Sequence, residues 1–275
     1  LTINGVVYNE MKGAFSSPDD VVSREVMNGL YPDTTYGLES GGDPEVIPEL
    51  TYEEFLKFHG KYYHPSNSLI YLYGNLDPEE YLTFLDEKYL SSYETLEVDS
   101  AIPLQKPFDK KRCVKREYSV MEGDIAENET YLTYNIAMGS SLDRELYIAM
   151  DVLVHVLCSD PGSPVKQALV DAGIGDEVYS YSETGIAQPY FSITAKNASS
   201  AQQEQFVSII EEELRKIVKH GIDRKALLAT LNEFEFRYRE ADFGGYPKGL
   251  MYGLQIFDSW LYDETKPFIH VEALD

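Results

Sequence analysis

A stretch without hydrophobic periodicity, residues 91–111, divides this sequence into two parts with different patterns. It carries Pro103 and Pro107 among polar and acidic neighbours, a composition typical of a linker between domains. The chain has 275 residues, more than one compact core usually fills, so two domains are expected. The predicted organisation is a first unit, a linker and a second unit at 1–101, 102–111 and 112–275.

Before the linker, capping signals predict a series of short helices. Thr51 and Glu54 form a capping box, and Asp77 followed by Pro78 is a second well-formed helix start. A short segment rich in β-formers lies between these two helices and predicts a strand. The expected elements are helices at 3–15, 21–30, 51–63 and 77–89 and a strand at 68–73.

Behind the linker, pairs of strands precede groups of helices. Alternation of polar and apolar residues predicts four strands, at 113–120, 129–138, 176–182 and 189–196. Helical periodicity and caps predict helices at 142–157, 163–172, 200–220, 223–240 and 247–261. This order indicates an α+β fold of two layers, with helices packed on one face of an antiparallel sheet.

The charge balance limits the classes of partner. The formal net charge is −24, and phosphate binding depends on Lys and Arg, so neither nucleic acid nor an anionic membrane surface is expected as a partner. No apolar run is long enough to span a membrane. The two cysteines, Cys113 and Cys158, form no CxxC pair and are interpreted as ordinary thiols in a reducing compartment. We therefore expect a soluble protein of the cytoplasm or of an organelle matrix.

The residues themselves contain no finished catalytic motif. The five histidines form neither HExxH nor HxxEH, and no GxSxG elbow is present. His59, His64 and His220 lie at predicted helix ends, and His155 falls within a predicted helix, so structural roles are favoured for all four. The glycines of the loop at 40–44 lack the strand–loop–helix context of a phosphate site.

Glu10 is the sharpest local anomaly. On a helical wheel it lies inside the apolar arc of the first predicted helix, between Val6 and Ile3. A carboxylate turned toward an apolar face needs a cation, a metal ion or several donors to offset its desolvation. Alternatively, Glu10 lies at the edge of the stripe and reaches water or pairs with a lysine; the pattern alone favours this second reading.

Ordered motifs along nearly the whole chain, from VVYNEMKGAF at 6–15 to GIG at 173–175, resemble those of the M16 (insulinase/pitrilysin) metallopeptidases, in their presequence protease branch. The segment VVYNEMKGAF at 6–15 resembles the one that carries the distal zinc ligand in that branch. Further matching motifs are SGGDP at 40–44, IPELT at 47–51, FH at 58–59, YHPSN at 63–67, YGN at 73–75, GSP at 162–164, AL at 168–169 and GIG at 173–175.

The resemblance implies a fragment of a zinc-dependent metalloendopeptidase that degrades short unfolded peptides in an enclosed chamber. In the parent protein, an HxxEH motif upstream of Leu1 would supply two histidine ligands and the water-activating glutamate, and Glu10 would be the remaining Zn²⁺ ligand. The chain itself contains no HxxEH motif, so we expect it to hold an incomplete metal site, no general base and no activity alone. Its expected partners are peptide substrates and the remaining domains of the parent, with self-association through an exposed sheet edge as a further expectation.

The same resemblance assigns identities to the predicted units. Residues 1–101 correspond to the C-terminal half of the first, catalytic M16 domain, and 112–275 to a second, non-catalytic M16 domain that is truncated at its C-terminal end. An alternative function remains open at this point, a non-catalytic M16-like scaffold or interaction subunit, because some relatives keep the fold and have lost the metal.

Overall fold

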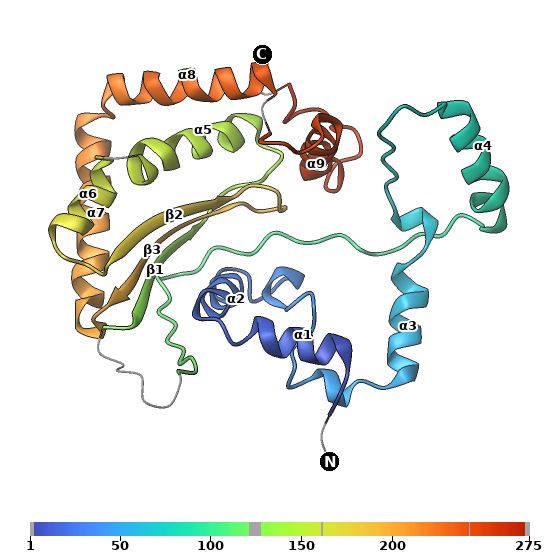
Figure 1. Ribbon diagram of the computed structural model, residues 1–275, viewed down its shortest axis with the longest axis horizontal. Helices are drawn as coiled ribbons and strands as arrows, with labels where there is room; N and C mark the ends of the chain where they lie inside the picture. The colour runs from blue at the N-terminus through green and yellow to red at the C-terminus, as the bar shows by residue number, and fades with distance from the viewer. Residues whose placement is uncertain (1–2, 121–127, 161, 242, 273–275) are drawn as a thin grey trace.

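The computed structural model describes residues 3–120, 128–160, 162–241 and 243–272. Nine α-helices and three strands lie within these residues (Figure 1). The helices are α1 (Val6–Ala14), α2 (Pro18–Leu30), α3 (Tyr52–Tyr62), α4 (Pro78–Lys88), α5 (Arg144–Val154), α6 (Pro164–Asp171), α7 (Gln203–His220), α8 (Arg224–Glu240) and α9 (Lys248–Trp260). The strands are β1 (Thr130–Ala137), β2 (Glu177–Glu183) and β3 (Tyr190–Ala198). A π-helical turn, η5 (His155–Ser159), extends α5, and single 3₁₀ turns include η1 (Thr35–Gly37).

Local capping chemistry explains where the helices begin and end. The capping box of Thr51 and Glu54 is confirmed, with hydrogen bonds in both directions. Asp77 accepts a hydrogen bond from the Glu79 amide at the start of α4. Gly221 ends α7 with a φ of 84°, a conformation that glycine adopts without strain. The predicted helices are confirmed to within a few residues at each end.

The three strands form one antiparallel sheet in the order β1-β3-β2. The central strand β3 pairs Ile193 with Tyr134 of β1 and with Ser180 of β2. The predictions of strands at 129–138, 176–182 and 189–196 are confirmed. The prediction at 113–120 is wrong, because these residues, all described, form no strand. Alternation alone does not make a strand when no neighbouring chain completes its hydrogen bonds.

The predicted strand at 68–73 is also wrong; these residues are extended but belong to no sheet. Tyr71 and Tyr73 lie instead against two glycines one turn apart on α9. The Tyr71 hydroxyl donates to the Gly249 carbonyl at 2.7 Å, and a Cβ atom at Gly249 or Gly253 would overlap a tyrosine ring. Side-chain packing on a helix therefore replaces the strand pairing that the β-rich composition suggested.

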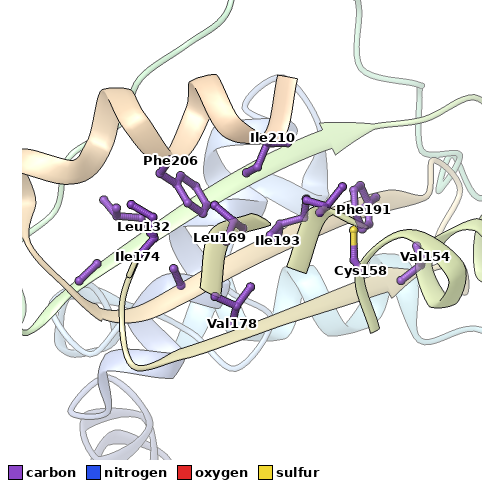
Figure 2. Packing of buried hydrophobic residues seen from close by; sticks show 13 residues of the cluster. Leu132, Val154, Cys158, Leu169, Ile174, Val178, Phe191, Ile193, Phe206 and Ile210 are labelled. Atoms are coloured by element: carbon purple, nitrogen blue, oxygen red, sulfur yellow. The ribbon is translucent and has the colours of Figure 1, made fainter. Parts of the chain in front are cut away.

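The main hydrophobic core lies between one face of the sheet and α5, α6 and α7 (Figure 2). Alternate residues of β3, Phe191, Ile193 and Ala195, point into this core, as the two-residue period of a strand requires. From α7, Phe206 and Ile210 pack against them, and both side chains are almost fully buried.

The opposite face of the sheet is covered in part by α2, which comes from the first predicted unit. Leu30 and Tyr31 pack on Tyr190 near one end of β3, and Asp19 forms a 2.7 Å ion pair with Lys196 near the other. The α+β class and the helices packed on a face of an antiparallel sheet are confirmed. The contact of α2 with the sheet adds a helix on the second face.

Candidate functional site

Glu10 lies in the middle of α1, and its side chain is exposed. None of the residues Val6–Ala14 is buried. Part of the apolar arc that the wheel predicted is exposed as well, with Val6 at 77% and Val7 at 55%. Glu10 and the apolar residues beside it therefore form one uncovered surface within the described chain.

The end of α1 nearest to α2 is held by specific contacts. The Met11 side chain lies directly on the backbone of Gly41, so closely that a Cβ atom at Gly41 would overlap its sulfur. The Phe15 ring lies under the guanidinium group of Arg24, 3.9 Å from its carbon to the ring centre. These contacts fix α1 on α2 and on the glycine loop, while Glu10 remains free to meet another chain segment.

The described residues do not complete a metal site around Glu10. Among residues 3–120, 128–160, 162–241 and 243–272, no group of three or more His, Cys, Asp or Glu side chains could hold a metal ion. The described residues thus do not by themselves bring together the three protein ligands of a catalytic zinc centre. The assignment of Glu10 as a ligand stays a prediction.

The histidines have structural surroundings, as predicted. His59 stacks on Tyr63, with ring centres 4.5 Å apart, and the His64 Nδ1 atom accepts a hydrogen bond from the Ser66 amide. His155 packs edge-on against Phe234. His220 is the last residue of α7 and favours the negative end of the helix dipole.

The two cysteines are free thiols, in agreement with their interpretation from the sequence. Cys158 is buried in the main core, and burial raises the pKa of its thiol to about 12. At neutral pH it therefore carries almost no thiolate, the reactive form.

A partly buried cluster of polar groups that the sequence did not reveal surrounds the loop between β2 and β3. The Tyr36 hydroxyl accepts a hydrogen bond from the Ala187 amide at 3.0 Å and lies 2.8 Å from the Tyr262 hydroxyl. Tyr31, fully buried, donates to the Gln188 carbonyl at 2.6 Å. Residues separated by about half or more of the chain meet here, so no local pattern could have indicated them.

The linker is attached to the same loop. Gln105 is buried, and its backbone N–H donates to the side-chain oxygen of Gln188 at 2.9 Å. Its side-chain nitrogen donates to the Asp33 carboxylate, and its side-chain oxygen accepts from the Asp33 backbone N–H. This residue therefore ties the linker both to the β2–β3 loop and to the segment that follows α2.

Asp258 of α9 lies at the inner side of this cluster. It accepts a hydrogen bond from the Tyr147 hydroxyl at 3.1 Å. Burial, with a smaller contribution from Glu183, raises the pKa of Asp258 to about 6, although the hydrogen bond acts in the opposite direction. Burial also raises the pKa of Tyr147, so its hydroxyl remains a donor at neutral pH.

Asp258→Asn is expected to stabilise the protein at pH 8. The pKa of Asp258 is higher in the folded chain than its ordinary value of 3.8, so the folded state binds the proton more tightly. The group therefore favours folding below pH 3.8, and this contribution is lost as the pH rises through about 6. Asparagine can accept the Tyr147 hydrogen bond without charge, so a gain of about 2 kcal/mol at pH 8 is expected, vanishing near pH 4.

Urea unfolding at the two pH values measures this difference, and Asp263→Asn is the matched control. Hydrogen bonds from Thr265 lower the pKa of the partly exposed Asp263, so removal of its charge should have the opposite effect on stability at pH 8. Equal stability of Asp258→Asn and the wild type at both pH values would contradict the prediction.

In the part of the chain that the structure describes, no helix is long and apolar enough to cross a membrane.

Known proteins resemble this chain in both sequence and structure. The family model described as "Peptidase M16 inactive domain" matches residues 49–234, across the predicted linker. Protein HypA of Clostridium perfringens is 45% identical over 99% of this chain and 28% of its own length. Presequence protease 1 of Arabidopsis thaliana is 36% identical over 100% of this chain and 26% of its own length. The chain thus spans little more than a quarter of these relatives.

Solved structures agree on the fold. A peptidase M16 inactive domain from Pseudomonas fluorescens aligns with a TM-score of 0.68 and 18% identity, over 98% of this chain and 62% of that one. A protease from Helicobacter pylori aligns with a TM-score of 0.64 and 16% identity, over 98% and 66%. Because the family model covers more than half of the sequence, the chain belongs to the M16 peptidase family and matches its inactive domain.

Proposed function

We propose that this chain is part of a zinc-dependent metalloendopeptidase that degrades short unfolded peptides in an enclosed chamber, and that it is inactive alone. The observation that carries the proposal is the alignment of the whole chain, Glu10 segment included, with a presequence protease at 36% identity. In this proposal 1–101 are the C-terminal half of a catalytic domain, 102–111 a linker, and 112–275 belong to a second, non-catalytic domain.

Glu10 is the metal ligand that this chain contributes. Its carboxylate is exposed at the centre of α1, where a second segment of a longer protein can approach it. Val6 and Val7 are exposed on the same helix, so the same approach would bury apolar surface. A bound zinc ion would supply Lewis acidity toward a peptide carbonyl and a more acidic bound water.

Further exposed apolar surface supports domains beyond this chain as partners. Every residue of α3 except Tyr62 is exposed, and Phe55 and Phe58 expose 61% and 59% of their surface. On α4, Leu82 and Phe84 are each 60% exposed. Both helices lie away from the sheet (Figure 1). Contiguous apolar surface of this kind usually belongs to an interface. In the isolated chain it would favour self-association.

Glu10→Gln in the longer protein tests the proposal. Loss of one of three protein ligands is expected to weaken zinc binding by roughly 100-fold or more, since even second-shell changes cost 10- to 100-fold. Metal analysis after dialysis and cleavage of an unstructured peptide are the two measurements. Glu80→Gln, an exposed glutamate on α4, is the control and should retain both zinc and activity. Full zinc occupancy in the Glu10→Gln variant would show that Glu10 is not a zinc ligand.

The negative net charge of the chain suggests which peptides the longer protein would cleave fastest. A net charge of −24 attracts cations, so basic peptides are expected to be cleaved faster than matched acidic ones, and the difference should shrink as salt is added. Equal rates for both peptides at low salt would count against this preference.

A second function, a non-catalytic scaffold or interaction subunit, is favoured by one observation. The family model that matches is that of an inactive domain. If the longer protein binds no zinc and cleaves no peptide while remaining folded, this second function is the correct one.

A further inference from the structure

The segment after α9, residues 261–272, has no helix or strand and folds back over the start of α5. Isolated backbone hydrogen bonds hold its turns. For example, the Lys266 amide donates to the Asp263 carbonyl and the Glu272 amide to the Phe268 carbonyl. Ser259, at the end of α9, donates to the Pro267 carbonyl at 3.3 Å. With so few regular hydrogen bonds, the position of the segment depends on its side chains.

His270 is the side chain that anchors this segment. It is 1% exposed, and its ring stacks on Tyr147 of α5 with centres 3.7 Å apart and planes 8° from parallel. The Nε2 atom lies 2.6 Å from the Ser141 carbonyl, so the neutral ring carries its proton on Nε2 and donates there. The buried Nδ1 atom has no hydrogen-bond partner within the described residues.

The surroundings of the ring suit an uncharged imidazole. Tyr147 from α5 contacts it, and Asp258 from α9 lies behind the Tyr147 hydroxyl, with Glu183 of β2 acting on Asp258. No carboxylate forms an ion pair with His270 within the described chain. A second ring proton would therefore place a charge in a buried site with no carboxylate to pair with it.

We propose that His270 is a pH-sensitive latch: its neutral ring holds residues 261–272 on α5, and its protonation releases them. This device is independent of the proposed peptidase function.

The direction of the effect follows from burial. Desolvation lowers the pKa of His270 below its ordinary value of 6.5, although backbone groups of Ser141 and Gln255 oppose the shift. The latched state therefore binds fewer protons than the released state, so latching is strongest above pH 6.5 and weakens as the pH falls below it. Asp258 acts in the opposite direction, since its proton uptake on acidification removes a buried charge.

The test is amide hydrogen exchange of the 275-residue chain between pH 8 and pH 5, corrected for intrinsic rates. Exchange of the Lys266 and Glu272 amides measures the opening of the segment. The fluorescence of Trp260, the single tryptophan, gives a second measure at the end of α9, next to the segment. The opening constant of the segment is expected to rise by up to tenfold per pH unit below pH 6.5, while α7 amides stay protected.

Three variants separate the latch from other causes. His270→Phe keeps a ring to stack on Tyr147 but cannot titrate, so its opening constant should no longer rise as the pH falls, whether the segment is closed or open. His220→Phe, at the exposed end of α7, should retain the wild-type pH dependence. Asp258→Asn should retain it too, or steepen it.

Two results would overturn the proposal. One is a wild-type segment that stays protected at pH 5 while ring chemical shifts show His270 to be charged. The other is a His270→Phe chain that keeps the wild-type slope with pH.

Discussion

Phe206→Ala is expected to lower the free energy of unfolding by about 3–5 kcal/mol, the range for a fully buried large side chain. Phe206 is 1% exposed, on the face of α7 that packs against the sheet. Its ring lies in the same cluster as Leu132 of β1 and Leu169 of α6, so its removal leaves a cavity that three elements line. Each neighbour is held by its own backbone hydrogen bonds and can move only slightly into the space.

Val218→Ala on the same helix is the matched control. Val218 is 87% exposed, so its substitution should change stability by less than about 0.5 kcal/mol. Urea unfolding followed by circular dichroism measures both variants. Both substitutions raise helix propensity, so equal losses in the two would contradict the claim that burial of Phe206 against the sheet stabilises the protein.

What could be predicted from the sequence was local in origin. The start of α3 depends on Thr51 and Glu54, and the end of α7 on Gly221, residues that act within one turn of the element they limit. Patterns that depend on distant neighbours were less informative. The composition at 68–73 predicted a strand, but whether such a segment joins a sheet depends on the chain beside it, here α9.

The candidate sites differ in the same way. Glu10 drew attention because its charge breaks the apolar period of a single helix, and the resemblance to M16 peptidases then offered a role for it. The packing of Tyr36 with Tyr262 and of His270 with Tyr147 joins residues that are far apart in the chain. Each of these residues is ordinary in its own segment, so only the folded chain indicates what it does.

The position of α2 is another property that no local pattern carries. Its caps and period predict a helix, and the linker at 102–111 suggested that it belongs to a separate unit. In the structure it covers one face of the sheet through Tyr31 and Asp19, contacts with residues of β3. The helix and the sheet are therefore expected to unfold together, although the proposed domain boundary lies between them.

Gly175→Ala is expected to destabilise the protein by about 3 kcal/mol or more, through two separate effects. Gly175 has a φ of 67°, where a residue with a Cβ atom costs about 1–2 kcal/mol. In addition, its added Cβ atom would overlap the Lys196 carbonyl of β3. That carbonyl accepts the Asp176 amide at 2.9 Å, so relief of the overlap would disturb the contact between this turn and the central strand.

Gly173→Ala separates the two effects, because the same turn supplies a glycine with the strain but without the overlap. Gly173 has a φ of 64°, and a Cβ atom there would meet no other atom within 4 Å. Its substitution should therefore cost only the backbone strain, about 1 kcal/mol. The difference in the free energy of unfolding between the two variants, measured by urea unfolding, gives the cost of the overlap with β3 alone. Since Ile174 between them is completely buried in the main core, the approach of the turn to β3 also sets how deeply its side chain packs. Equal losses for both variants would show that the turn can move away from β3 freely, which is incompatible with a core closed by Ile174.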